Sequence, residues 1–232
     1  MLRRLASSLV VLSLGVGIAA AHPNTYRFED DLVRTDDVLR FAQPPSDGPV
    51  AADPITAPVA VVDRAQVRAA LAARRAQNLA LFHAYRTAGV YPHNFVQAGT
   101  LNVWLDPEGH LCAAATIINN SGNTDLAMSV PSMNNYLKLI DVTEGPLMDW
   151  ILTSGFTQDE IAMIQEPFVG VRPQPIAEPP DGQRLAEDAR LAKRYAVVEK
   201  TLKKQRKASL DAAVDRLISE NPELAASLVA SM

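Results

Sequence analysis

One stretch decides the fold of this chain: 63-DRAQVRAALAARRAQNLALFHAYRTA-88, which Gly89 and Pro92 follow. The side chains that recur in it at three- and four-residue steps are Val67, Leu71, Asn78, Phe82 and Tyr85. This spacing places them on one face of a helix. Asp63 is a suitable N-cap, and a glycine followed by a proline is typical of a helix end. The stretch therefore predicts a long helix that packs this face against a folded body.

The rest of this helix surface is rich in positive charge. Its arginines are Arg64, Arg68, Arg74, Arg75 and Arg86. We interpret them as the solvated face of a surface helix, because a run of charge at helical spacing is typical of such a face. A binding site for an anion is the alternative.

The segment that follows this helix alternates in polarity and then turns. Residues 101–105 alternate, Asp106-Pro107-Glu108-Gly109 is strong turn chemistry, and residues 110–118 form an apolar run. This pattern predicts a β-hairpin. The alternative is a helix that begins at about Cys112, because the alanines that follow it favour helix.

Further helices are predicted over residues 125–142 and 146–154, with Gly155 as a stop. Thr157-Gln158-Asp159-Glu160 then fits a capping box. In this motif the threonine side chain accepts the backbone N–H of the glutamate, and the glutamate side chain accepts the backbone N–H of the threonine. A helix through residue 165 is predicted to follow. The apolar residues of these helices predict a shared core; they are Leu147, Trp150, Ile151, Phe156, Ile161 and Ile164.

Prolines mark the boundaries of the folded part. The chain has 16 prolines against 11 glycines, and many of the prolines cluster within residues 22–62 and 169–182. We interpret the first segment as a flexible arm and the second as a linker. Residues 63–168 are then the folded body and residues 183–232 a helical tail. The tail has one long helix to about residue 220, and Asn221-Pro222 begins a short last helix. The predicted class is mainly α, or α+β at most: a small helical body with one β-hairpin, proline-rich linkers and a long C-terminal helix.

The first 21 residues have the pattern of a signal peptide. Arg3 and Arg4 precede an apolar run that ends in Ala19-Ala20-Ala21, which is a charged region, a hydrophobic region and a cleavage site with small residues. The run is shorter than the roughly 20 apolar residues that span a bilayer. We therefore expect cleavage near Ala21 and an exported protein, periplasmic or secreted.

Charge is divided unevenly along the chain after residue 21. Residues 22–182 carry a net charge of −9 and residues 183–232 a net charge of +3, with seven positive side chains between residues 193 and 207. We expect this basic helix to bind a protein partner or to self-associate, for example as a coiled coil. An anionic membrane surface is the alternative. Nucleic acid is not expected, because the chain is exported and acidic overall.

Few residues suggest chemistry. The composition, with 48% hydrophobic and 21% charged residues, is that of a soluble globular chain, and no phosphate-binding loop, dinucleotide-binding or hydrolase motif is present. His83, His93 and His110 are candidate metal ligands, but no pair has the four-residue spacing of a helical metal site, so no metal or other cofactor is expected. The single cysteine, Cys112, lies two residues after His110. A Cys112/His110-dependent hydrolase or transferase is therefore one hypothesis.

Five short motifs carry a resemblance. They are Arg75-Ala76-Gln77-Asn78-Leu79, Tyr85-Arg86-x-x-Gly89, Tyr91-Pro92-His93-Asn94, Leu111-Cys112-Ala113-x-Ala115 and Leu152-Thr153-Ser154-Gly155-Phe156-Thr157. Together they resemble a group of uncharacterised exported bacterial proteins with no assigned activity. The resemblance covers residues 70–168 and implies that these form the folded unit, but it implies no reaction or ligand. The sequence therefore favours a non-catalytic interaction or structural protein over the enzyme hypothesis.

Overall fold

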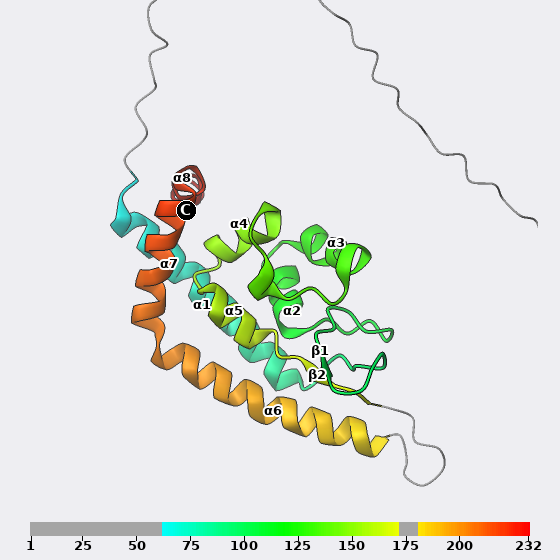
Figure 1. Cartoon of the computed structure of the whole chain (residues 1–232). Helices are drawn as coiled ribbons and strands as arrows, with labels where there is room; N and C mark the ends of the chain where they lie inside the picture. The colour runs from blue at the N-terminus through cyan, green and yellow to red at the C-terminus, as the bar shows by residue number, and fades with distance from the viewer. Residues whose placement is uncertain (1–61, 172–180) are drawn as a thin grey trace, which may run out of the picture. The chain divides into compact units, whose positions relative to one another are not determined.

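The computed structural model describes residues 62–171 and 181–232. The predicted signal peptide 1–21, nearly all of the 22–62 arm and most of the 169–182 linker lie outside the described residues. The fold is mainly α, as predicted (Figure 1). Its α-helices are α1 (Arg64–Ala88), α2 (Ala113–Asn120), α3 (Thr124–Asn134), α4 (Gly145–Thr153), α5 (Gln158–Ile164), α6 (Asp181–Lys204), α7 (Arg206–Glu220) and α8 (Pro222–Ala230), with a 3-10 turn, η1, at Leu139–Asp141 and strands β1 (Thr100–Leu101) and β2 (Phe168–Val169). Within this described part, none of the helices has the length and apolar character needed to cross a membrane.

Helix α1 is the scaffold of the unit and forms as predicted. The Asp63 carboxylate accepts a hydrogen bond from the Ala65 backbone N–H at 2.8 Å, and Gly89 ends the helix with φ of 66°. The predicted face is buried, and helices α2, α6, α7 and α8 all pack against α1. Phe82 and Tyr85 of that face each lie edge-on to Tyr195 of α6, with ring centroids 5.6 Å apart.

The structure contains only the turn and the first bridge of the predicted β-hairpin. Gly109 closes the turn with φ of 89°, and Leu105 forms a single antiparallel bridge with Leu111. Helix α2 starts immediately afterwards, with Cys112 as its N-cap, so the helical alternative is confirmed for residues 113–118 and the strand is wrong there. The two-stranded antiparallel sheet instead joins β1 to β2, which lie far apart in sequence. The alanines after Cys112 outweigh the short-range hairpin signal because they favour helix and are also small enough to be buried.

The C-terminal segment is not a separate tail. The described residues, 62–171 and 181–232, form one compact unit. Helices α6, α7 and α8 contribute to its hydrophobic core through Leu191, Tyr195, Val198, Leu202, Leu210, Val214, Leu217, Ala225 and Leu228. The long helix predicted to residue 220 is also two helices, with a sharp bend at Gln205 (Figure 1). Residues 203–207 are all exposed, so no buried side chain holds the helix straight at this point.

The arginine-rich surface of α1 is where the C-terminal helices dock. Arg64 pairs with Asp215 and Arg68 with Asp211, each at 2.8 Å, and both acidic residues belong to α7. Arg86 pairs with Glu199 of α6, also at 2.8 Å. The interpretation of these arginines as a solvated face therefore holds for Arg74, which is exposed. It missed the acidic residues of α6 and α7 that pair with Arg64, Arg68 and Arg86, because it assumed that no other element covers the helix.

Arg75 departs furthest from that interpretation, because it is only 2% exposed. Its guanidinium binds both carboxylate oxygens of Glu160, at 2.6 and 2.7 Å. It also donates to the backbone carbonyls of Gly155 and Leu202, both at 2.9 Å. Glu160 is the glutamate of the predicted capping box, which is confirmed on α5. A single buried ion pair therefore joins α1, the start of α5 and the end of α6.

Candidate metal centre

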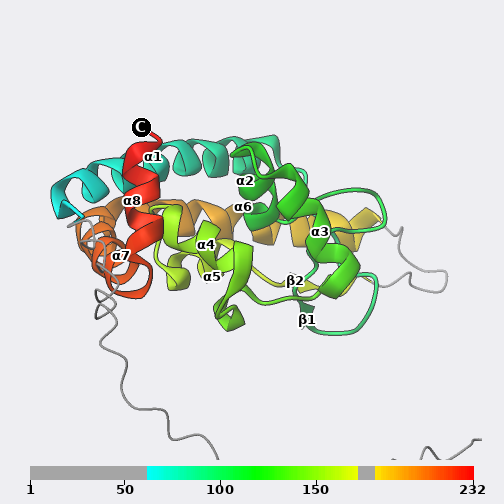
Figure 2. The ribbon, with the colours of Figure 1, turned by 90° about the horizontal axis from the view of Figure 1, so that it is seen from above.

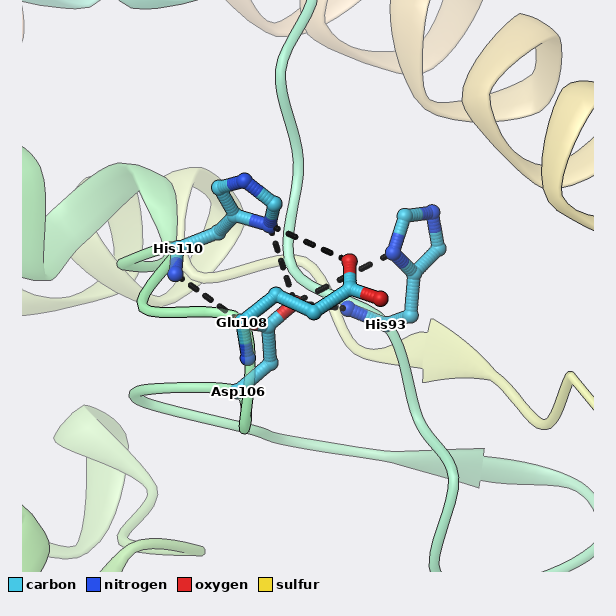
Figure 3. A group of neighbouring side chains, drawn as sticks. All are labelled: His93, Asp106, Glu108 and His110. Carbon is cyan, nitrogen blue, oxygen red and sulfur yellow. Dashed lines mark hydrogen bonds and ion pairs between the residues drawn. The ribbon is translucent and has the colours of Figure 1, made fainter.

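The Cys112 thiol lies in the core. It is 0% exposed, and its Sγ accepts the backbone N–H of Ala115 at 3.4 Å, which caps α2. Burial raises the pKa of this thiol to about 12, although hydrogen bonds from backbone amides lower it. Because α2 begins here, Cys112 turns inward, whereas the His110 ring turns toward the 106–109 turn (Figure 3). Because its pKa is about 12, the Cys112 thiol is neutral near pH 7.

His83 lies in a charge cluster between α1 and α6. Its Nδ1 is 3.1 Å from Oε1 of Glu199, whose carboxylate also binds Arg86 and Lys203. Burial opposes ionisation of Glu199, but hydrogen bonds from Lys203, Arg86 and His83 outweigh it and lower the pKa of this carboxyl. The two cations already satisfy the carboxylate. This histidine therefore belongs to an ion-pair network.

The other two candidate histidines come together with two carboxylates. His93, Asp106, Glu108 and His110 form one cluster, in which one possible ligand atom of each residue lies within 4.8 Å of all the others (Figure 3). His110 Nδ1 is 3.1 Å from Asp106 Oδ2 and 3.8 Å from Glu108 Oε2. His93 Nδ1 is 3.9 Å from the same Asp106 oxygen. In Figure 3 the two imidazole rings lie on either side of the Glu108 carboxylate.

The turn at residues 106–110 builds most of this cluster. Oδ1 of Asp106 accepts the backbone N–H groups of Glu108 and His110, at 2.9 and 2.8 Å. Its Oδ2 accepts the backbone N–H of His93 at 3.2 Å. These bonds hold the carboxylate, whose side chain is 0% exposed, in one orientation. The turn at residues 106–110 therefore reverses the chain and also brings the side chains of Asp106, Glu108 and His110 together.

His93 has one ring nitrogen satisfied and one free. Nε2 lies 3.3 Å from Oδ1 of Asp188 on α6. The side chain is only 8% exposed, and its Nδ1 is buried without a hydrogen-bond partner among the described residues. An N–H at Nε2 that donates to Asp188 leaves the lone pair at Nδ1, on the side of Asp106. A buried acceptor without a partner is costly, so a hydrogen-bond donor or a cation is expected there.

A second residue of α6 closes the outer side of the cluster. Arg184 pairs with Oε1 of Glu108, and its guanidinium lies over the Phe95 ring, 4.9 Å from the centroid. The Phe95 ring in turn lies 5.8 Å from that of His93. Glu108 Oε2 remains directed toward His110. The first turns of α6 thus supply both outer contacts of the cluster.

This arrangement has the ligand chemistry of a divalent transition metal. Two imidazole nitrogens and two carboxylate oxygens suit zinc, whereas calcium and magnesium prefer oxygen ligands alone. Bonds of about 2.0 to 2.2 Å to a tetrahedral ion place the ligand atoms about 3.3 to 3.6 Å from one another. Three of the separations, 3.1, 3.8 and 3.9 Å, lie close to these values, and all four ligand atoms lie within 4.8 Å of one another, so side-chain movements that close the cluster would complete the site.

Sequence reasoning identified only part of this cluster. His93 and His110 were candidates, but His83, the third, lies elsewhere, and Asp106 and Glu108 were interpreted only as turn residues. The spacing Asp106-x-Glu108-x-His110 was the available local signal. Nothing local could have indicated His93, whose ring reaches the turn through tertiary packing. No protein-family model matches this chain, and neither a curated protein nor a solved structure is detectably similar to it.

Proposed function

We propose that this chain is an exported, non-catalytic protein that binds one divalent transition-metal ion through His93, Asp106, Glu108 and His110. The observation that carries the proposal is the buried Nδ1 of His93, which has no hydrogen-bond partner in residues 62–171 and 181–232 and lies on the side of the Asp106 carboxylate. Zinc is the ion of choice, because imidazole nitrogens and carboxylate oxygens are both zinc ligands and zinc favours a four-coordinate tetrahedral arrangement. Export rests on the signal-peptide pattern of residues 1–21.

A metal-free cluster of protonated histidines and carboxylates is the competing description. It accounts well for His110, whose Nδ1 lies within hydrogen-bond distance of Asp106. It accounts poorly for His93, because the 3.9 Å between Nδ1 and Oδ2 of Asp106 is too long for a hydrogen bond. A metal ion would satisfy both ring nitrogens and both carboxylates at once.

The ion would have a structural role at this position. Its ligands come from a loop and a turn, and the outer contacts of those ligands come from α6. With four protein ligands, no coordination position remains for a water nucleophile, which a catalytic zinc requires. The neutral, buried thiol of Cys112 also argues against the hydrolase or transferase hypothesis.

Calorimetry with zinc chloride tests the site. The chain from residue 22 onward, freed of metal with a chelator, should bind one zinc ion, and either His93→Ala or His110→Ala should weaken binding at least about 100-fold. Asp188→Ala should weaken it by about 10- to 100-fold, because it removes the acceptor that orients His93. His83→Ala is the matched control, because it also removes a histidine paired with a carboxylate. Unchanged binding in both cluster variants would refute the proposal.

The interaction role expected from the basic C-terminal helix also remains a proposal. Five exposed cations on α6 and α7 make no ion pair with any residue that the structure describes; they are Lys193, Lys200, Lys204, Arg206 and Lys207. We propose that they bind an acidic surface of a second copy. Sedimentation at low and high salt tests this, because association through exposed charges should weaken as salt screens them. A monomer at both salt concentrations would contradict it.

A further inference from the structure

A polar pocket lies away from the metal cluster, at the place where α8 packs against α1 and α4. Figure 2 shows the position of these three helices. Its volume is about 310 Å³, at the lower end of the range for small-molecule sites. Side chains of α1, α4 and α8 line it together with the turn between α2 and α3. A ligand that fits this space is therefore no larger than a few chemical groups.

Two opposite charges line this pocket without pairing. Arg74 of α1 and Asp149 of α4 are both exposed, and neither makes an ion pair or side-chain hydrogen bond within the part of the chain that the structure describes. Arg74 differs in this respect from the other four arginines of α1, each of which has an acidic partner. One pocket thus offers a free cation and a free anion.

A buried amide adds an unsatisfied acceptor beside them. Asn78 is 2% exposed and lies one turn after Arg74 on α1. Its Nδ2 donates to the Ser154 carbonyl at 2.9 Å, but its Oδ1 has no partner among the described residues. Because a buried acceptor without a donor is costly, this oxygen points to a missing donor group.

Part of the remaining wall is apolar, and its largest ring is held in place. Trp150 is 8% exposed, and its indole N–H donates to the hydroxyl oxygen of Ser121 at 3.2 Å, which fixes the ring. Leu126 of α3 and Leu224 of α8 line the same pocket. A hydrocarbon group is therefore the natural occupant of this part.

We propose that this pocket binds a free apolar amino acid. The guanidinium of Arg74 would bind the ligand carboxylate, because a guanidinium matches a carboxylate in charge and shape. Asp149 and Oδ1 of Asn78 would accept from the ligand ammonium group. The ligand side chain would lie against Trp150. No single-charge ligand satisfies the cation, the anion and the buried acceptor together.

Matched ligands test the proposal by calorimetry on the chain from residue 22 onward. Leucine, methionine and phenylalanine represent the proposed class, and 3-methylbutylamine and 4-methylpentanoate each keep the leucine side chain with only one of its two charges. We expect at least one amino acid to bind, and the matched analogues of leucine to bind at least about tenfold more weakly than leucine itself. Absence of binding by all three amino acids at about 10 mM would overturn the proposal.

Two surface variants identify the contacts. Arg74→Ala and Asp149→Asn should each weaken amino-acid binding at least about tenfold. Lys138→Ala should not, because it removes an exposed cation that lies outside the pocket and has no ion pair with a described residue. Both changed side chains are exposed, so circular dichroism should show an unchanged fold. Wild-type binding by both variants, or equal binding of leucine and its single-charge analogues, would overturn the proposal. Zinc binding is measured in parallel, so that the two sites are judged separately.

Discussion

Removing the buried cation that joins three helices should nearly unfold this protein. Arg75→Met leaves the Glu160 carboxylate buried, with side-chain exposure of 3%, and without its counterion. An uncompensated buried charge of this kind costs about 3 to 5 kcal/mol. The carbonyls of Gly155 and Leu202 also lose a donor, at about 1 kcal/mol each. The expected loss of about 5 to 7 kcal/mol is comparable with the whole stability of many domains.

Urea unfolding followed by circular dichroism measures this loss. A chain that is unfolded in buffer is measured with added trimethylamine oxide, which favours the folded state. Arg68→Met is the matched control, because its ion pair with Asp211 is more than one-third exposed on both sides and should matter far less.

A double variant separates the buried charge from the packing. Arg75→Met with Glu160→Leu removes both charges, so it should be about 2 to 4 kcal/mol more stable than Arg75→Met alone. It should stay below the wild type, because Glu160 also caps α5 through the Thr157 backbone N–H at 3.0 Å. A double variant no more stable than the single one would refute the reasoning, since the cost would then come from lost packing and not from an unpaired carboxylate.

Three further predictions test other parts of the fold. Gly155→Ala should cost more than about 3 kcal/mol in urea unfolding, because the new Cβ would lie 2.2 Å from the Leu71 carbonyl oxygen and φ is +79°, whereas Gly122→Ala, with open space around it at φ +92°, should cost only about 1 kcal/mol. Cys112 should resist iodoacetamide at pH 7 in the native protein and react only in denaturant, because burial raises its pKa to about 12; rapid native labelling would contradict this. Glu199→Gln should destabilise the protein near neutral pH. The folded state lowers the pKa of the Glu199 carboxyl below its unfolded value near 4.5. Its contribution to the free energy of unfolding is therefore present above pH 4.5 and is lost as the pH falls through the folded pKa. The difference in stability between Glu199→Gln and the wild type should accordingly shrink in acid. A difference that grows in acid would contradict this.

The sequence predicted the elements better than their pairing. The caps at Asp63 and Thr157 form as expected, because each depends only on residues within three positions. The partner of β1 could not be predicted, since Phe168 lies on a strand of two residues that has no pattern of its own. Four of the five arginines of α1 were misjudged for the same reason, because acidic residues of other elements pair with them. Whether a charged face is solvated depends on what covers it, and local periodicity does not contain that information.

The candidate site also shows that a local sequence pattern predicts a turn but not the tertiary contacts around it. Its turn is local, so the positions of Asp106 and His110 follow from a sequence pattern that was recognised as a turn. Its completion is not local, because the Nε2 of His93 needs an acceptor that arrives on α6. Each contributing residue therefore had an ordinary explanation when it was considered alone.

Helix α6 connects the proposed metal site to the stability of the whole unit. Near its start it holds the outer side of the metal cluster through Asp188 and Arg184. In its middle, Tyr195 packs among the aromatic rings of α1. At its end, the Leu202 carbonyl accepts from Arg75. Because one rigid helix makes all these contacts, an ion that stabilises its first turns binds the folded state better than the unfolded chain, and its binding free energy adds to the stability of the unit.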